Sequence, residues 1–398
     1  MVAEIDELEP EGVDACEYRG ASPYPVRVGR IAALFLALSV LVTSCTAAPA
    51  PGGGAVGSAA PSADIKQSKL DISYTALAEN HYASPTSKAL LTAALDAFRK
   101  EAKAAGSTIE VPTPEFEDKS EPLLPDFKKF AEAAKRIAAA TPQVSADRFA
   151  DAAILAMLNV KPDCHAYYRP RRSATVAGPV LAAVASAETA QLAQPDEAGL
   201  DSKIIAGNIG YVTWKEFKKT ATYDITTEVK KALDRLLAAG ARAWMFDLRA
   251  NVGGDPPQTM TSWFLNGEKI MDIRMKTGSA GIVTARPEFR LPDAYQLPLA
   301  ILLNGRGGSS PEVFTLGLKE NKRATVVGQK SRGCLGAFSP LTLADGSFVA
   351  VPNREFVGAV TGARYNNVGI PPDVPADDAT AVEVATRILQ EHIAKGTR

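Results

Sequence analysis

The sequence predicts a helical domain followed by a mixed α/β core, which places the fold in the α+β or α/β class. From residue 65 to 169, apolar residues recur at three-to-four spacing, as in amphipathic helices. From residue 203 to 398, short apolar runs alternate with helical patterns, which is typical of a strand-and-helix layer. Residues 170–202 have no strong period, and we interpret them as a linker or a weak hairpin.

The composition is that of an ordinary globular protein, with 46% hydrophobic and 22% charged residues. A length of 398 residues is compatible with two or three domains. The formal net charge of −1 gives no basic footprint for nucleic acid, so no nucleic-acid partner is expected.

Residues 1–44 are predicted to be a leader with a lipoprotein signal peptide. Arg27 and Arg30 precede an apolar run at 31–42, which is too short to span a bilayer comfortably. The run ends in Val-Thr-Ser-Cys45, which resembles a bacterial lipobox, so Cys45 is the expected lipidation site. The protein is then expected to be exported and lipid-anchored on the extracytoplasmic face of the cell membrane. An ordinary signal peptide and a membrane-spanning anchor are the alternatives, and residues 45–64 are expected to be a flexible tether.

Four helices are predicted for the N-terminal domain, and the last runs into the segment Pro162-Asp163-Cys164-His165. In the core, a buried strand at 243–248 leads into a loop that ends in Gly253 and Gly254. Besides the helix that begins near Pro311, the expected helices cover 70–81, 87–105, 124–140, 146–158, 223–239 and 379–395. The expected strands cover 210–214, 243–248, 299–303 and 324–327, with a hairpin around 344–347.

The core is organised around residues 299–329, a strand–helix–strand unit with Ser309-Ser310-Pro311-Glu312 where the first strand leads into the helix. A helix N-terminus offers unpaired N–H groups and partial positive charge, which can hold an oxyanion. Pro311 is expected at the first helical position, with Ser310 as the cap and Ser309 outside the helix. On this motif alone, a nucleophile and a simple helix start are equally good explanations.

Four motifs in order resemble the carboxy-terminal processing (tail-specific) proteases and the related tricorn protease core. Asp247-Leu-Arg-Ala-Asn-Val-Gly-Gly254 is similar to their glycine loop, and Ser309-Ser310-Pro311-Glu312 to their nucleophile turn. Asp345-Gly-Ser347 resembles their hairpin, and Tyr365-Asn-Asn-Val-Gly-Ile-Pro-Pro-Asp373 a stretch near their C-terminus. The resemblance implies a core of the ClpP/crotonase-like kind. Residues 170–202 are too short for the PDZ insert of this family.

The resemblance implies a nucleophile at Ser309 and an oxyanion hole made by the amides of Ser310 and of Gly253 or Gly254. The processing branch uses a lysine as base, but the matching position here is Cys334, and Lys330 is four residues away. The lysine-lacking, tricorn-like branch uses a histidine from the N-terminal segment, and His165 matches that position.

The sequence does not assign the third group, which should orient His165. The tricorn-like branch has a glutamate where this chain has Asn366, and an amide there costs the imidazole its counter-charge. Three carboxylates, Asp163, Glu355 and Asp373, are candidates that the sequence does not rank. The resemblance also brings Cys164 and Cys334 to the catalytic centre, where a disulfide or two unrelated buried thiols are equally expected. No metal or organic cofactor is implied.

The sequence therefore favours a membrane-tethered serine endopeptidase that cleaves extended or unfolded polypeptides. The alternative is a catalytically inactive relative that binds a peptide or a partner as a lipoprotein, which Asn366 and Cys334 favour. An esterase would use the same nucleophile. The oligomeric state is not predicted.

Overall fold

The computed structural model describes residues 68–171 and 196–396. The expected leader, the lipidation site at Cys45, the tether and most of the linker at 170–202 lie outside these residues. None of the helices in the described ranges combines the length and apolar character needed to cross a bilayer.

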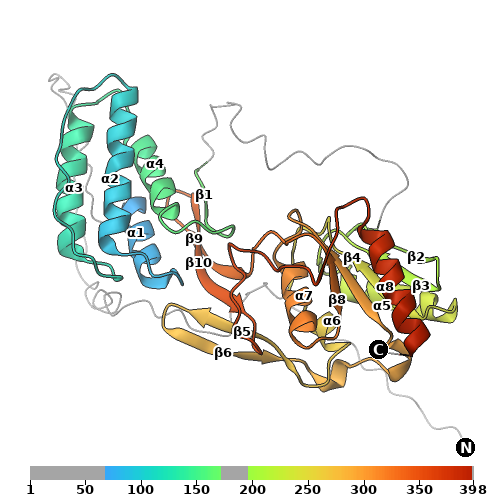
Figure 1. The fold of residues 1–398 in the computed structure, drawn as a ribbon. Coiled ribbons are helices and arrows are strands. Elements are labelled where there is room, and N and C mark those ends of the chain that lie inside the picture. The colour runs from blue at the N-terminus through green and yellow to red at the C-terminus, as the bar shows by residue number, and fades with distance from the viewer. Residues whose placement is uncertain (1–67, 172–195, 397–398) are drawn as a thin grey trace, which may run out of the picture. The chain divides into compact units, whose positions relative to one another are not determined.

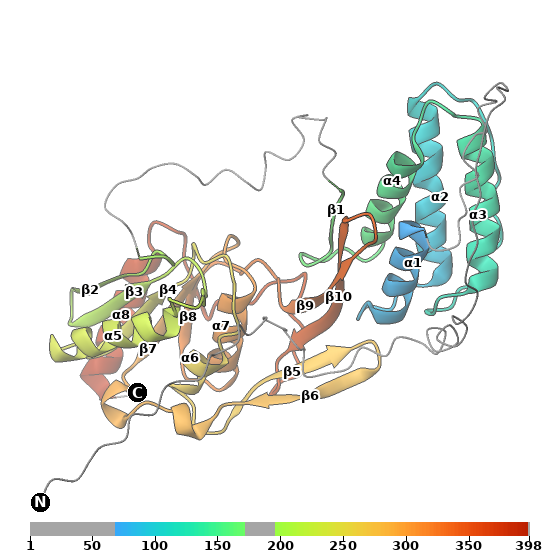
Figure 2. The ribbon, with the colours of Figure 1, turned by 180° about the vertical axis from the view of Figure 1, so that it is seen from behind.

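Four helices form an N-terminal bundle, within two residues of the predicted ranges (Figure 2). Ser68, Thr86 and Ser145 precede three of them, and each side chain accepts a hydrogen bond from a first-turn amide, which fixes the helix start. Stacked and edge-on aromatic rings fill the centre of the bundle. The helices are α1 (Lys69–Asn80), α2 (Ser87–Ala104), α3 (Leu124–Ala139) and α4 (Ala146–Leu158).

A six-stranded sheet forms the centre of the core (Figure 1). Its strands lie in the order β11-β8-β7-β4-β3-β2. All neighbours are parallel except the β2–β3 pair. The strands are β2 (Asp201–Ile205), β3 (Ile209–Thr213), β4 (Ala243–Asp247), β7 (Leu299–Leu303), β8 (Thr325–Gly328) and β11 (Val374–Pro375). β2 begins inside the segment that the sequence analysis assigned to the linker.

Both faces of this sheet are covered by helices, because side chains alternate between the two faces along each strand. Trp244 and Phe246 of β4 pack into a cluster with α5 (Ile225–Ala238), α6 (Gln258–Ser262) and α7 (Ser310–Glu320). Ala243 and Met245 of the same strand pack with α8 (Ala381–Lys395) on the opposite face. The continuous apolar runs of the sequence are therefore strands buried on both sides.

A second, antiparallel sheet has the order β1-β10-β5-β6, and β9 also pairs with β10. Its strands are β1 (Tyr167–Arg169), β5 (Lys269–Met275), β6 (Gly278–Thr284), β9 (Gly336–Thr342) and β10 (Phe348–Val357). The turn between β9 and β10 is the predicted hairpin. Leu343, Val349 and Val351 from this hairpin pack in the same apolar cluster as α1–α4. The helical bundle and the second sheet thus share one core.

The parallel order brings two loops to one edge of the first sheet. β4 and β7 are adjacent and parallel, so the loop that follows each strand leaves from the same end. The loop after β4 contains Gly253 and Gly254, and the loop after β7 contains Ser309. The glycine loop and Ser309 are distant in the sequence, but the parallel order of β4 and β7 brings them to the same edge of the sheet.

Candidate active site

Ser309 lies at the junction between the β7 loop and α7, in an uncommon backbone conformation. Its φ is 71° and its ψ is −119°, which is a sterically costly region for a residue with a Cβ. Ser309 is the N-cap of α7, and the helix begins at Ser310. The expectation that Ser310 is the cap and that Ser309 lies outside the helix is therefore wrong by one residue.

The carboxylate of Glu312 holds this turn in place. Glu312 is fully buried, and its Oε2 accepts hydrogen bonds from the amides of Ser309 (2.8 Å) and Cys334 (2.7 Å). Its Oε1 accepts from the amide of Gly333 (2.6 Å) and from the hydroxyl of Ser331. One charged group is thus satisfied by four donors, and it ties the 331–334 loop to the start of α7.

The glycine loop contacts Ser309 directly. A Cβ placed on Gly253 would lie 2.9 Å from the Cβ of Ser309 and 3.3 Å from its Oγ, and Gly253 has a φ of 110°. The Ser310 hydroxyl donates to the carbonyl of Gly254 at 2.8 Å, which fixes the loop against the helix start. Position 253 therefore accepts only glycine, because any Cβ there would collide with Ser309.

The amides of this region are not equally available. The Gly253 amide donates to Oδ1 of Asn251 at 3.0 Å. Among the hydrogen bonds of the described residues, none uses the amide of Gly254 or that of Ser310. An oxyanion next to Ser309 could therefore be held by Gly254 and Ser310 without breaking a bond, whereas Gly253 would have to leave Asn251.

His165 lies in the loop between α4 and β1, and Asp163 is its partner. The Nδ1 atom of His165 is 3.1 Å from Oδ1 of Asp163, and the His165 amide donates to the same oxygen at 2.8 Å. The Asp163 side chain is 1% exposed and the His165 side chain 13% exposed. An ionised Asp163 requires the hydrogen on Nδ1, which leaves Nε2 as the basic nitrogen.

Burial raises the pKa of Asp163, but hydrogen bonds from His165 and Asn366 outweigh it and hold the pKa at about 2. The other carboxylate oxygen, Oδ2, accepts from the Tyr82 hydroxyl at 3.0 Å and from Nδ2 of Asn366 at 2.7 Å. Nδ2 of Asn366 also donates to the Tyr82 oxygen at 2.7 Å. Asp163 is therefore held as an anion by donors on both sides.

This network corrects the expectation for Asn366. The group at Nδ1 of the imidazole is Asp163, while Asn366 holds Asp163 and accepts the amide of Leu335 at 2.8 Å through its own Oδ1. The other two candidate carboxylates are engaged elsewhere. Glu355 pairs with Arg364, and Asp373 pairs with Lys319 and accepts the amide of Val326.

A disulfide links the histidine segment to the serine turn. Cys164 and Cys334 are bonded, with their Cα atoms 5.8 Å apart. The two sulfurs and a ring nitrogen of His165 lie within 4.8 Å of one another. Cys334 in turn contacts the serine turn, because a Cβ placed on Gly308 would lie 3.1 Å from the Cys334 Cβ. The imidazole is thus held beside the loop that carries Ser309.

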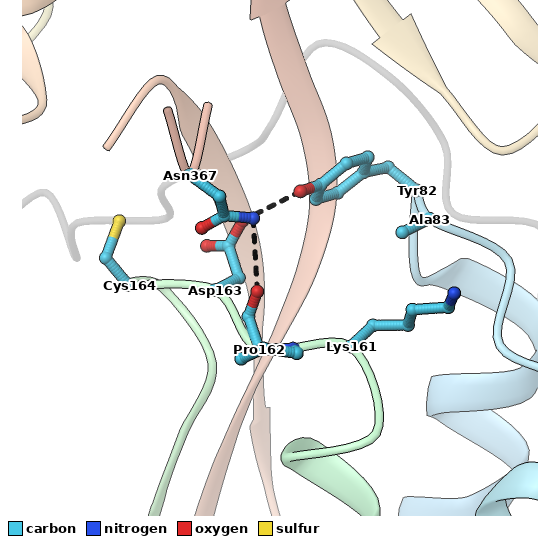
Figure 3. Close-up of a pocket in the computed structure, with 7 residues that line it drawn as sticks. All are labelled: Tyr82, Ala83, Lys161, Pro162, Asp163, Cys164 and Asn367. Carbon is cyan, nitrogen blue, oxygen red and sulfur yellow. Dashed lines mark hydrogen bonds between the residues drawn. The ribbon is translucent and has the colours of Figure 1, made fainter. Parts of the chain in front are cut away.

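A hollow of about 440 Å³ lies beside Asp163 (Figure 3). The Tyr82–Asp163 hydrogen bond lies at its wall, and the side-chain amide of Asn367 reaches across to the carbonyl of Pro162 at 3.1 Å. The lining residues are Tyr82, Ala83, Lys161, Pro162, Asp163, Cys164 and Asn367. In the described part of the chain, the only His/Cys/Asp/Glu group with metal-ligand geometry is Cys164, His165 and Cys334, and the bond between its two sulfurs leaves no thiolate for a metal.

A serine at a helix start, beside backbone amides and near a carboxylate-held imidazole, is the arrangement that serine hydrolases use. Residues 208–376 match the model of peptidase family S41. This segment contains the glycine loop, Ser309 and Asn366, whereas Asp163 and His165 precede it. The resemblance to carboxy-terminal processing proteases that the motifs indicated is confirmed.

The individual proteins that the chain resembles are also described as carboxy-terminal processing proteases. The chain is 28% identical over 179 residues to the carboxy-terminal processing protease CtpA of Bacillus subtilis, covering 44% of this chain and 36% of that protein. It is 30% identical over 186 residues to the chloroplastic carboxyl-terminal-processing peptidase 2 of Arabidopsis thaliana, covering 42% and 32%. The structure of a photosystem II D1 C-terminal processing protease is 26% identical, with 46% of each chain covered and a TM-score of 0.38. The chain spans about a third of the length of the curated relatives it matches.

Proposed function

We propose that this chain is a serine endopeptidase that cleaves extended or unfolded polypeptides, with Ser309 as nucleophile and His165 as general base. Asp163 orients the imidazole, and the amides of Ser310 and Gly254 hold the oxyanion. The observation that carries the proposal is the joint placement of three parts. The strained Ser309 turn contacts the glycine loop. The Cys164–Cys334 disulfide links the segment that holds the Asp163–His165 pair to the 331–334 loop, which packs beside Gly308.

The chemistry follows from these positions. The Ser309 oxygen attacks the scissile carbonyl carbon, and its proton passes to Nε2 of His165. The resulting oxyanion accepts from the backbone amides, and one such donor is typically worth about a hundred- to a thousand-fold in rate. The imidazolium then gives its proton to the leaving amine, and water hydrolyses the acyl-enzyme by the same route. The anionic Asp163 stabilises the imidazolium in both steps.

The geometry weakens the main argument for an inactive relative. That argument depended on Asn366 as the third group and on the missing lysine at Cys334. Because Asp163 supplies the carboxylate, neither substitution removes a catalytic part from the Ser309–His165–Asp163 set. The intact carboxylate therefore favours catalysis over mere partner binding.

A fluorophosphonate probe tests the nucleophile. We expect covalent labelling of the full-length chain at Ser309 and cleavage of an unfolded protein substrate. Ser309→Ala should abolish both, because it removes the attacking oxygen. Absence of labelling in the wild-type chain would favour the peptide- or partner-binding alternative. Cleavage of simple esters but not of polypeptides would favour an esterase.

The membrane anchor is a separate part of the proposal and depends on the lipobox-like sequence before Cys45. We expect a bacterial host to export the chain and to attach lipid at Cys45, so that it partitions with membranes. Cys45→Ala should move the protein out of the membrane fraction and abolish incorporation of labelled palmitate. Membrane retention of this variant would instead support an uncleaved anchor.

A further inference from the structure

We infer that the Cys164–Cys334 disulfide is a redox switch for the Ser309–His165 pair, so that the oxidised chain is the active form. This inference rests on the proposed function, because it concerns regulation of the same site. The two cysteines are 170 positions apart and come from the two segments that must meet for catalysis. Cys164 is the immediate neighbour of His165, and Cys334 contacts Gly308, the immediate neighbour of Ser309.

The Cys334 side of the bond is fixed to the serine turn in either redox state. Glu312 accepts the amides of Ser309, Gly333 and Cys334, and none of these bonds involves sulfur. Cys334 is 6% exposed and packs inside this loop. When the disulfide is reduced, we therefore expect the backbone at Cys334 to stay in place.

The Cys164 end of the disulfide is held less firmly than the Cys334 end. Cys164 is exposed and lies in the loop between α4 and β1. Its segment is held by side-chain contacts to its two neighbours, because Tyr82 and Asn366 donate to Asp163 and Asn367 donates to Pro162. The Cys164 sulfur is 3.3 Å from Nδ1 of His165. Movement of this sulfur therefore changes the surroundings of the nitrogen that also meets Asp163.

Reduction requires such a movement. Bonded sulfurs lie about 2 Å apart, whereas non-bonded heavy atoms keep roughly 3.5–4 Å. The two thiols must therefore separate by about 1.5 Å or more, and the less supported Cys164 side gives way. A misplacement of about 1 Å in an active site can cost about a hundred-fold in rate. The same displacement strains the Asp163–His165 hydrogen bond.

The exposed sulfur is also the one that a reductant reaches. Cys164 lines the 440 Å³ hollow (Figure 3), so a thiolate of a small dithiol attacks the Cys164 sulfur and forms a mixed disulfide. Cys334 leaves with the electron pair and takes a proton. The second thiol of the dithiol then displaces Cys164 and closes a cyclic disulfide. The dithiol is oxidised by two electrons, and the chain gains two thiols.

The test uses the full-length chain with Cys16→Ser and Cys45→Ser, which leaves only Cys164 and Cys334 of its four cysteines. The rate of fluorophosphonate labelling at Ser309 is measured in the oxidised form, after dithiol treatment and after re-oxidation. We expect reduction to slow labelling about a hundred-fold and re-oxidation to restore it. The matched control also carries Cys164→Ala and Cys334→Ala, and its labelling rate should not respond to dithiol.

A second readout follows the imidazole without relying on activity. The chain has three histidines, and the His165 ring signal in an NMR spectrum is assigned with His165→Gln. Reduction should shift this signal and leave that of His392 on α8 in place, with the far-ultraviolet circular dichroism unchanged.

The outcomes separate the two proposals. Equal labelling in both redox states, an unmoved His165 signal, or global unfolding on reduction would each overturn the switch. A shifted His165 signal in a chain that never labels would support the redox-driven movement and refute the proposed function.

Discussion

Asp163 and His165 form a carboxylate–imidazole pair, with Oδ1 3.1 Å from Nδ1. Only one residue separates them in the sequence, so a single loop carries both the proposed base and its counter-charge. The carboxylate is held from its other side by Tyr82 and Asn366, so the position of the pair depends on both the helical bundle and the core.

Asp163→Asn tests whether this carboxylate orients the base. We expect the rate on a polypeptide substrate to fall by about ten-thousand-fold, because the imidazole loses its tautomer and its counter-charge. The measurement is kcat/KM, with Asp373→Asn as the matched control, since Asp373 pairs with Lys319 away from the imidazole. Equal effects of the two substitutions would contradict the assignment of Asp163.

Asn366→Asp distinguishes the structure from the expectation that Asn366 is the third group. If Asn366 oriented the imidazole, a carboxylate there would raise activity. In the structure, the new oxygen would replace a donor that lies 2.7 Å from Oδ2 of Asp163, and like charges at that distance raise the pKa of one carboxyl group. We therefore expect lower activity and a pH–rate profile whose acidic limb moves to higher pH. Increased activity at neutral pH would refute the present assignment.

Gly253→Ala tests the close approach of the glycine loop to the nucleophile. The added Cβ would lie 2.9 Å from the Ser309 Cβ, so Ser309 must move, and we expect fluorophosphonate labelling to slow at least about a hundred-fold. Gly281→Ala is the control for backbone strain alone. Gly281 has a φ of 129°, and a Cβ there meets nothing within 4 Å. Labelling that falls equally in both variants would show that strain, and not contact with Ser309, is the cause.

Glu312→Gln tests the buried carboxylate that anchors the serine turn. The amide nitrogen would face donors that now bond to a carboxylate oxygen, leaving buried polar groups unsatisfied. We expect the free energy of unfolding to fall by about 3 kcal/mol in urea titrations. Glu391→Gln on the exposed face of α8 should change it by less than about 0.5 kcal/mol. Similar stability in both variants would contradict the anchoring role.

His81 gives the fold a pH dependence of its own. Burial, only partly offset by Asp163, lowers the pKa of His81 to about 4 from an ordinary value of 6.5. As the pH falls, the unfolded chain takes up this proton first, so the His81 contribution is complete above about pH 6.5 and is lost as the pH falls through 4. The loss corresponds to about 3 kcal/mol.

The pH dependence is checked by urea unfolding at pH 7 and pH 4. Wild-type and His392→Gln chains should lose stability between these values, whereas His81→Gln should lose about 3 kcal/mol less. If His81→Gln keeps the wild-type slope, the proton is taken up elsewhere.

The sequence predicted the helices of the bundle and the buried strands well, because their period and caps are local signals. Leu299–Leu303 is a strand at the predicted residues, since a short apolar run between turn residues has few alternatives. β5 and β6 were missed. β6 is exposed along most of its length and contains two glycines, so it carries no period that would reveal it.

The site was predictable only in part, for physical reasons. Ser309 stood out as a hydroxyl at a helix start, but its role as the cap depends on a positive φ that serine rarely adopts. Asp163 was not ranked above Glu355 and Asp373, because only tertiary structure decides which carboxylate meets an imidazole. The position of Asp163 two residues before His165 was a usable signal, but the family resemblance pointed to Asn366 instead.

Val349 and Val351 lie on β10, far along the chain from the four helices, yet their side chains complete the interior of the helical bundle. The helical bundle and the strands of the core would each expose an apolar surface if separated, because each now covers the other. The helical bundle that precedes His165 is therefore bound to the strands of the core by one continuous interior.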